Sequence, residues 1–250
     1  MGYVDKTRFS GSIYLGLPAN FNDKIILRRI NLIDTIPDFY NKNLNMVEVG
    51  CGNGATSLRL AEKFNKIDCL DISPLNQNDF ENYKNKLHVH NCNFSIVNIE
   101  NQNELKNKYD RLICFEVIEH FSDDSSVSKL FDMLKSGGKA AITVPNKWWI
   151  FETHGAKLPF LKWNRVPFFS WLPKPIHQKY ANARIYTSSR IVKLLQNAGF
   201  IVKDVKYITA PMDVLKEGKL KDLLTNFLFK NNTTKIPIFS TSIFISAEKS

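Results

Sequence analysis

The chain has 250 residues, of which 44% are apolar and 23% are charged, a composition typical of one large globular domain. No stretch approaches the ~20 apolar residues of a membrane-spanning helix, which argues against an integral membrane protein. The four cysteines stand singly, which argues against a disulfide or zinc framework, and the start of the chain lacks the apolar run of a signal peptide. We therefore expect a reduced, cytoplasmic protein.

The net charge of +10 is unevenly distributed. Residues 1–125 hold 14 Lys/Arg and 17 Asp/Glu, a net charge of −3, whereas residues 126–250 hold 20 and 7, a net charge of +13. This surplus indicates either a lysine-rich surface facing water or a face for an anionic partner. Such a partner would be an acidic or phosphorylated substrate, an anionic membrane surface or nucleic acid.

Strands and helices are predicted to alternate along the chain. Apolar residues at helical spacing predict a helix over 22–40, and a buried strand follows at 45–50. The later elements are helix 55–64, strand 67–73, helix 75–87, strands 92–100 and 109–117, helix 125–134, strand 139–145, helix 188–200, strand 201–208, helix 213–229 and strand 239–248. This order predicts an α/β fold with seven strands in one mostly parallel sheet and helices on both faces.

The first predicted strand runs into a glycine-rich turn, VEVGCGNG at 47–54. Glycines permit a tight turn and let the backbone approach a ligand closely. Asp71 follows at the end of the second strand, where a carboxylate can accept hydrogen bonds from both hydroxyls of a ribose. Glu48 lies beside the loop, where its charge would repel a pyrophosphate but suits an amino group. These features favour an adenosine-containing ligand that also carries an amino acid group.

Four motifs, VEVGCGNG, LDIS, FEVIEHFSD and LKSGGKAAITVPN, follow one another between about Met46 and Asn146. In this order and spacing the chain resembles the class I S-adenosylmethionine-dependent methyltransferases, among them the methyltransferase type 11 and ubiquinone-biosynthesis O-methyltransferase groups. A weaker similarity continues in RIYTSSRIVKLLQNAGF. The resemblance implies a Rossmann-like sheet of seven strands with the last one antiparallel, an aromatic insert after the fifth strand, and S-adenosyl-L-methionine as cofactor.

The same resemblance implies a set of cofactor contacts. Asn98 stands where the family more often has Asp. The implied contacts are Glu48, Gly50, Cys51 and Gly52 at the methionine part, Asp71 at the ribose, Ile72, Asn98 and Ile99 at the adenine, and Phe115 and Glu116 bordering the methionine.

The stretch after the fourth strand, LICFEVIEHF, holds Glu116, Glu119 and His120. These side chains would share one face of a helical turn, because positions i, i+3 and i+4 are neighbours. Two carboxylates and an imidazole suit Mg²⁺, Mn²⁺ or Zn²⁺. The E-x-x-E-H pattern also resembles the metal sites of ubiquinone-biosynthesis O-methyltransferases and of small-RNA 2′-O-methyltransferases. The second group needs a further histidine, for which His154 or His177 qualifies.

A second interpretation of this stretch needs no metal. The resemblance also covers methyltransferases that carry the motif without a known metal; in them Glu116 lines the cofactor, Glu119 turns outward and His120 faces the acceptor. His120 is then the first candidate for a catalytic base. His154 is the second, because it follows the fifth strand, where the substrate loops of this fold gather.

Residues 147–185 form an aromatic insert between the fifth strand and the next helix. The insert holds all four tryptophans, four phenylalanines, four prolines, seven Lys/Arg and one Glu. It is interpreted as a small satellite core, as the wall of an acceptor pocket, or as a segment that contacts an anionic membrane. RNA is the rival partner, because aromatic rings stack on bases and lysines neutralise phosphates.

We therefore expect an N-terminal helical cap over 1–44 and a methyltransferase domain over 45–250, with 147–185 as its substrate lid. The expected function is S-adenosylmethionine-dependent O-methylation of a small or lipid-linked acceptor, such as a quinol precursor, a sugar or a glycolipid. The alternatives are metal-dependent 2′-O-methylation of RNA and a non-catalytic accessory subunit that binds the cofactor. The expected location is the cytoplasm, with membrane association as a further option.

Overall fold

The structure is a computed structural model, and it describes residues 9–10, 13–14, 19–158, 166–212, 215 and 218–250. Parts of three predicted segments lie outside the described residues. These are 1–8, 11–12 and 15–18 of the N-terminal cap, 159–165 of the aromatic insert, and 213–214 and 216–217 of the helix predicted over 213–229.

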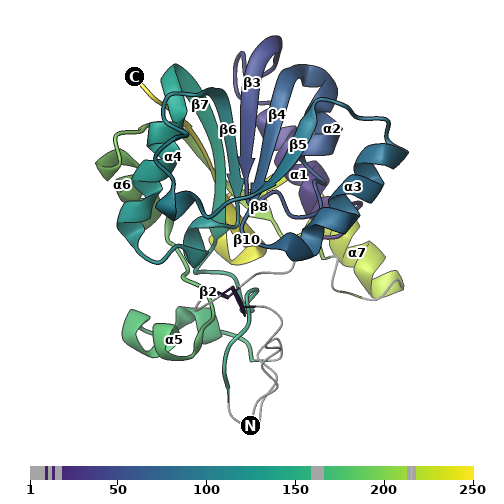
Figure 1. Cartoon of the computed structure of the whole chain (residues 1–250). Coiled ribbons are helices and arrows are strands. Elements are labelled where there is room, and N and C mark those ends of the chain that lie inside the picture. The colour runs from purple at the N-terminus through teal and green to yellow at the C-terminus, as the bar shows by residue number, and fades with distance from the viewer. Residues whose placement is uncertain (1–8, 11–12, 15–18, 159–165, 213–214, 216–217) are drawn as a thin grey trace.

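The molecule is built on one sheet whose strands lie in the order β5-β4-β3-β6-β7-β10-β8-β9 (Figure 1). The strands from β5 to β7 are parallel, and β10 is antiparallel to both of its neighbours, β7 and β8. The mostly parallel sheet with an antiparallel last strand is therefore confirmed. The bounds are β3 Asn41–Val49, β4 Phe64–Asp71, β5 Cys92–Ile96, β6 Tyr109–Phe115, β7 Leu134–Pro145, β8 Ile201–Thr209, β9 Thr233–Thr234 and β10 Ser240–Glu248.

Helices cover both faces of this sheet (Figure 1). Adjacent strand residues point to opposite faces, so Met46 and Val47 of β3 enter two separate apolar clusters. The Met46 cluster includes residues of α1, α2 and α3, and the Val47 cluster includes residues of α4 and α6. The helices are α1 Lys24–Ile33, α2 Ser57–Leu60, α3 Gln77–Lys86, α4 Val127–Met133, α5 Lys174–Tyr180, α6 Ser188–Asn197 and α7 Lys219–Phe227.

The sheet has eight strands, where the sequence predicted seven. The additional strand, β9, has two residues that pair with Tyr207 and Ile208 at the edge of the sheet. Two residues cannot display an alternating pattern, so β9 left no signal in the sequence. A separate hairpin of β1 (Phe9–Ser10) and β2 (Ile13–Tyr14) was also not predicted.

The carboxyl ends of the parallel strands meet at one edge of the sheet, since these strands point the same way. The glycine loop follows β3, Asp71 ends β4, and Phe115 ends β6. The aromatic insert follows β7 and extends from the same edge (Figure 1). The fold therefore gathers the predicted site segments in one place.

A buried arginine fastens α1 to the far part of the sheet. Arg28 donates hydrogen bonds to the backbone oxygens of Thr209, Ala210 and Phe229, the second of them at 2.9 Å. One side chain thus connects the N-terminal helix to the end of β8 and to the segment after α7.

Among the helices that the structure describes, none is long and apolar enough to cross a membrane.

Replacing Arg28 by methionine is expected to lower the free energy of unfolding by about 2–4 kcal/mol, because three buried carbonyls lose their charged donor. Urea denaturation measures this change. Lys24→Met is the matched control, since Lys24 is an exposed residue of the same helix and should change stability by less than about 0.5 kcal/mol. Equal stability of Arg28→Met and the control would contradict this role of Arg28.

Candidate functional site

The glycine loop adopts backbone conformations that only glycine accepts easily. Gly50 and Gly54 have φ angles of +74° and +78°. A Cβ added to Gly50 would lie 2.2 Å from Val117 Cγ2, and one added to Gly54 would lie 2.5 Å from the Phe80 ring. The loop backbone at Gly50 therefore lies against Val117, the second residue after β6, which leaves no room for a side chain between them.

Asp71 ties this loop to the end of β4. Its two carboxylate oxygens accept the backbone N–H groups of Gly52 and of Ser73, each at 2.8 Å. Burial raises the pKa of Asp71, against the opposing effect of these hydrogen bonds. The adjacent side chain of Ile72 is only partly buried. The ribose and adenine contacts expected of Asp71 and Ile72 stay predictions.

Glu48 is buried beneath the loop and faces the start of α2. Its Oε2 accepts the backbone N–H of Ser57 at 3.0 Å and also the Ser57 hydroxyl. Burial raises the pKa of Glu48 to about 7, although hydrogen bonds from Ser57 and Thr56 favour its charged form. The expected contact between Glu48 and an amino group of the cofactor stays a prediction.

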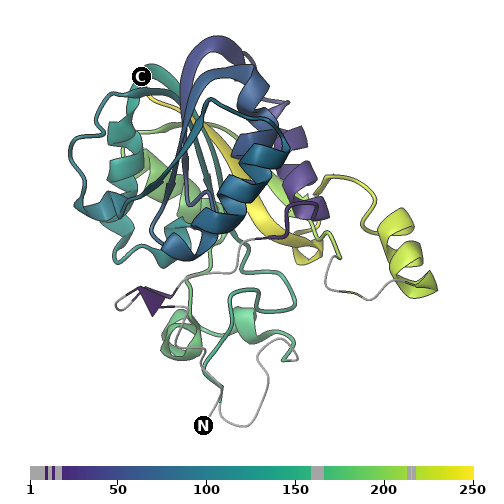
Figure 2. The same ribbon diagram turned by 45° about the vertical axis from the view of Figure 1, so that its right-hand side comes forward.

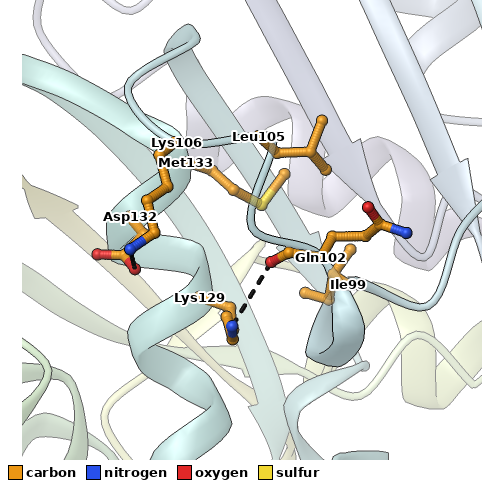
Figure 3. A pocket seen from close by; sticks show the side chains of 7 residues that line it. All are labelled: Ile99, Gln102, Leu105, Lys106, Lys129, Asp132 and Met133. Carbon is orange, nitrogen blue, oxygen red and sulfur yellow. Dashed lines mark hydrogen bonds and ion pairs between the residues drawn. The ribbon is translucent and has the colours of Figure 1, made fainter.

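Asn98 and Ile99 follow β5. The Asn98 side chain caps the next turn by accepting the backbone N–H of Glu100 at 3.0 Å. Ile99 is buried and lines a small cavity with Met133 and Lys129, whose ammonium group reaches the backbone oxygen of Gln102 at 3.5 Å (Figure 3). This cavity of about 10 Å³ holds roughly one water molecule, so it is not a ligand pocket.

Glu116, directly after β6, combines an unusual backbone conformation with an ion pair to α1. Glu116 has a φ of +56°, which is uncommon for a residue other than glycine. Its Oε1 lies 3.4 Å from Arg29 of α1, and the Arg29 guanidinium also stacks over the Phe115 ring at 5.5 Å. Arg29 therefore borders the predicted cofactor residues Phe115 and Glu116, a role that the sequence did not indicate.

Glu119, His120 and His154 meet next to this point. One ligand atom from each side chain lies within 4.8 Å of the others, an arrangement that a metal ion could bridge. The His154 Nε2 is 3.2 Å from Glu119 Oε1 and 3.8 Å from Glu116 Oε2, and the His120 and His154 rings are 5.4 Å apart. The histidine that completes the set is thus His154 rather than His177, and Glu116 lies at its margin.

The two histidines have opposite charge preferences in the absence of a metal. Burial lowers the pKa of His120 to about 4, so this imidazole is neutral at pH 7. Burial would also lower the pKa of His154, but the neighbouring carboxylates of Glu119, Glu116 and Glu152 outweigh it and raise the pKa to about 9. His154 therefore carries a proton at neutral pH and pairs with Glu119.

The buried carboxylate of Glu152 holds the backbone of the loop that carries His154. Glu152 Oε1 accepts the backbone N–H groups of Thr153 and His154 at 3.0 and 3.1 Å, while its Oε2 lies 2.7 Å from His177 Nε2. Burial alone would raise the pKa of Glu152, but His177 and the His154 N–H lower it. His177 belongs to α5, so Glu152 connects the far half of the insert to the loop that presents His154.

The rest of the insert presents aromatic rings to the surface. Trp148 and Trp171 pack edge to face at 6.2 Å, and Phe168 packs against Trp171 at 4.8 Å. All three rings are exposed, together with Phe151. The described part of the insert therefore combines a small buried centre around Glu152 with an apolar outer surface.

Replacing Glu48 by glutamine should flatten the pH dependence of stability. The folded pKa of about 7 lies above the ordinary value of 4.5, so the folded chain holds this proton more tightly than the unfolded chain. Stability from this group is full below about pH 4.5 and falls as the pH rises through 7. We expect Glu48→Gln to be more stable than the natural protein at pH 8 by on the order of 2–3 kcal/mol, with little difference at pH 4.5.

Chemical denaturation at both pH values provides this measurement. Glu62→Gln, at an exposed position, is the control and should follow the natural protein at each pH. An unchanged pH dependence in Glu48→Gln would contradict the raised pKa.

Comparison with known proteins identifies the family. Residues 40–216 match the family described as Methyltransferase domain. Malonyl-[acyl-carrier protein] O-methyltransferase 1 from Ilyobacter polytropus is 32% identical over 167 residues, which are 64% of this chain and 57% of that relative. Ubiquinone biosynthesis O-methyltransferase from Rickettsia prowazekii is 27% identical over 195 residues, which cover 72% of this chain and 71% of that protein.

Solved structures share the fold at low sequence identity. An S-adenosylmethionine-dependent methyltransferase from Mesorhizobium loti matches 89% of this chain and 98% of its own length, with a TM-score of 0.61 and 11% identity. The [4+2]-cyclase SpnF matches 88% of this chain and 80% of its own length, with a TM-score of 0.59 and 16% identity. The second case shows that the fold alone does not specify the reaction. The reaction is instead indicated by the family match. The chain belongs to the methyltransferase domain family and is an S-adenosylmethionine-dependent methyltransferase.

Proposed function

We propose that this methyltransferase methylates an oxygen atom of a small or lipid-linked acceptor, such as a quinol precursor, a sugar or a glycolipid. The observation that carries the proposal is that His154, from the insert after β7, lies beside Glu119 and His120, which follow β6. The names of the two relatives agree with it, since both are O-methyltransferases.

Different residues at the strand ends would bind the cofactor and the acceptor. S-adenosylmethionine supplies a methyl group that is already activated, so the protein has to align the acceptor, exclude water and remove the acceptor's proton. The glycine loop and Asp71 would hold the cofactor, with Arg29 and Glu116 at its border. The aromatic insert would cover the acceptor and exclude water.

A divalent metal fits the group of Glu119, His120 and His154. Glu119 is buried, and within the described part of the chain no hydrogen bond reaches its Oε2. A carboxylate with two imidazoles is a suitable set for Zn²⁺ or Mn²⁺, and a bound cation would compensate the buried charge of Glu119 in place of the protonated His154. When bound, the cation would act as a Lewis acid that favours loss of the proton from an acceptor hydroxyl.

Without a metal, one of the two histidines, His120, can still accept a proton from the acceptor. His154 already holds a proton against Glu119, so it cannot take another from the acceptor. His120 is neutral and can accept a proton, but its pKa of about 4 makes it a weak base for an alcohol. The chemistry of the site therefore favours the metal for an unactivated hydroxyl.

RNA 2′-O-methylation is the second candidate. It is supported by the same convergence, because the small-RNA methyltransferases that the sequence resembles need a further histidine besides E-x-x-E-H, and His154 lies next to Glu119 and His120. A direct comparison of acceptors separates the two candidates. Methyl transfer to a dihydroxylated aromatic compound and not to a short RNA supports the first, and the reverse result supports the second.

Removal of the metal should strongly reduce methyl transfer. We expect dialysis against EDTA to lower the activity at least tenfold, and added Zn²⁺ or Mn²⁺ to restore it. Elemental analysis of the purified protein provides a second readout, with about one metal ion per chain in the natural protein and far less in Glu119→Gln or His154→Ala. His90→Ala, at an exposed position, is the matched control. Activity that persists at full rate without detectable metal would overturn the metal-dependent mechanism.

Glu152 is expected to act through the position of His154. Glu152→Ala removes the acceptor of the Thr153 and His154 N–H groups and should reduce metal content and kcat about 10–100-fold, with a smaller effect on the cofactor Kd. Glu152→Gln keeps one oxygen acceptor and should recover part of the loss. A folded Glu152→Ala protein with natural metal content and kcat would show that the pair with His177 only stabilises the insert.

A further inference from the structure

α7 presents apolar side chains to the outside of the molecule. Leu223, Phe227, Leu228 and Ile236 are 58%, 81%, 56% and 50% exposed, and we call them the α7 patch. Leu223 and Phe227 are four residues apart on one face of the helix. Figure 2 shows α7 standing off the side of the sheet, apart from the aromatic insert.

The exposure of this patch does not result from a loosely attached segment. Phe229, two residues after α7, is buried, and its ring packs against Phe239 at 5.5 Å. Its backbone oxygen accepts a hydrogen bond from Arg28 of α1. Phe229 is therefore the side chain that attaches this segment to the protein interior, while Phe227 and Leu228 remain exposed.

Lysines surround the α7 patch. Lys219 begins the helix, Lys230 follows it, and Lys235 precedes Ile236; all three are exposed. Leu228, Ile236 and Lys235 also line an open groove beside β8. Asp222 is the exposed acidic residue within α7, so positive charge predominates around the apolar side chains. Exposed apolar side chains that gather in one place on a protein surface often mark an interaction site, whereas single ones are common.

We propose that the α7 patch docks onto the surface of a lipid bilayer that contains anionic lipids. Leu223, Phe227 and Leu228 would enter between the headgroups, and the flanking ammonium groups would contact the phosphates, as in other interfacial amphipathic helices. The headgroups at such a surface carry phosphate groups, which attract the ammonium groups of the lysines. The docking concerns a surface apart from Glu119, His120 and His154, so it stands whichever acceptor the enzyme methylates.

The size of the patch argues against a second copy of the chain as its partner. A stable protein–protein interface buries about 800 Å² on each partner. Four side chains on and beside a nine-residue helix do not supply such an area. Insertion into a bilayer has no such requirement, because each apolar side chain and each lysine contributes separately.

Vesicle flotation tests this proposal with the 250-residue chain. The natural protein should float with vesicles of phosphatidylcholine and phosphatidylglycerol, but not with phosphatidylcholine alone, and high salt should reduce the binding. The double variant Leu223→Ser/Phe227→Ser should bind at least about tenfold more weakly, because it loses the inserted side chains. Leu87→Ser, at an exposed apolar position after α3, is the control and should bind like the natural protein.

Three results would overturn the proposal. The first is failure of the natural protein to float with the anionic vesicles. The second is equal flotation of the double variant, which would assign membrane binding to another surface, such as the aromatic insert. The third is concentration-dependent dimerisation in sedimentation that the double variant loses, which would make a second copy the partner of the α7 patch. The substituted side chains are exposed, so circular dichroism spectra should be the same for all variants.

Discussion

The close approach of Gly50 to Val117 is the constraint on which the site depends. The Val117 side chain occupies the space that a Cβ at Gly50 would need, so the loop after β3 lies directly against the turn after β6. That turn begins with Glu116 in a left-handed conformation and continues to Glu119 and His120. This contact therefore holds the glycine loop next to the turn that carries Glu119 and His120.

Three carboxylates, those of Glu48, Glu116 and Glu119, belong to the site around this contact. The charge of each is compensated in a different way. Glu48 is buried with hydroxyl and amide donors, and burial favours its protonated form. Glu116 has Arg29 of α1 as its cationic partner. Glu119 has a protonated His154, which a divalent cation would replace. Glu116 and Glu119 thus each lie beside a cationic side chain, and a bound metal ion would compensate the charge of Glu119 in place of His154.

Much of this site could be predicted from local sequence. The glycine loop, Asp71 and the E-x-x-E-H motif are each contiguous with a strand end, and parallel strands bring such ends to one edge. The partner of Glu119 could not be fixed in this way, because His154 comes from a long insert whose path depends on the buried pair of Glu152 and His177. Arg29 and β9 were missed for a similar reason, since their roles come from packing and not from a local pattern.

The most direct test is a crystal structure with S-adenosylhomocysteine and Mn²⁺, analysed by anomalous scattering. We expect one strong anomalous peak bound by Glu119, His120 and His154, with the cofactor product along the glycine loop and Asp71. A structure with the cofactor product in that place but no metal between these three residues would contradict the metal-assisted mechanism. A cofactor product bound away from the glycine loop would contradict the assignment of the site itself.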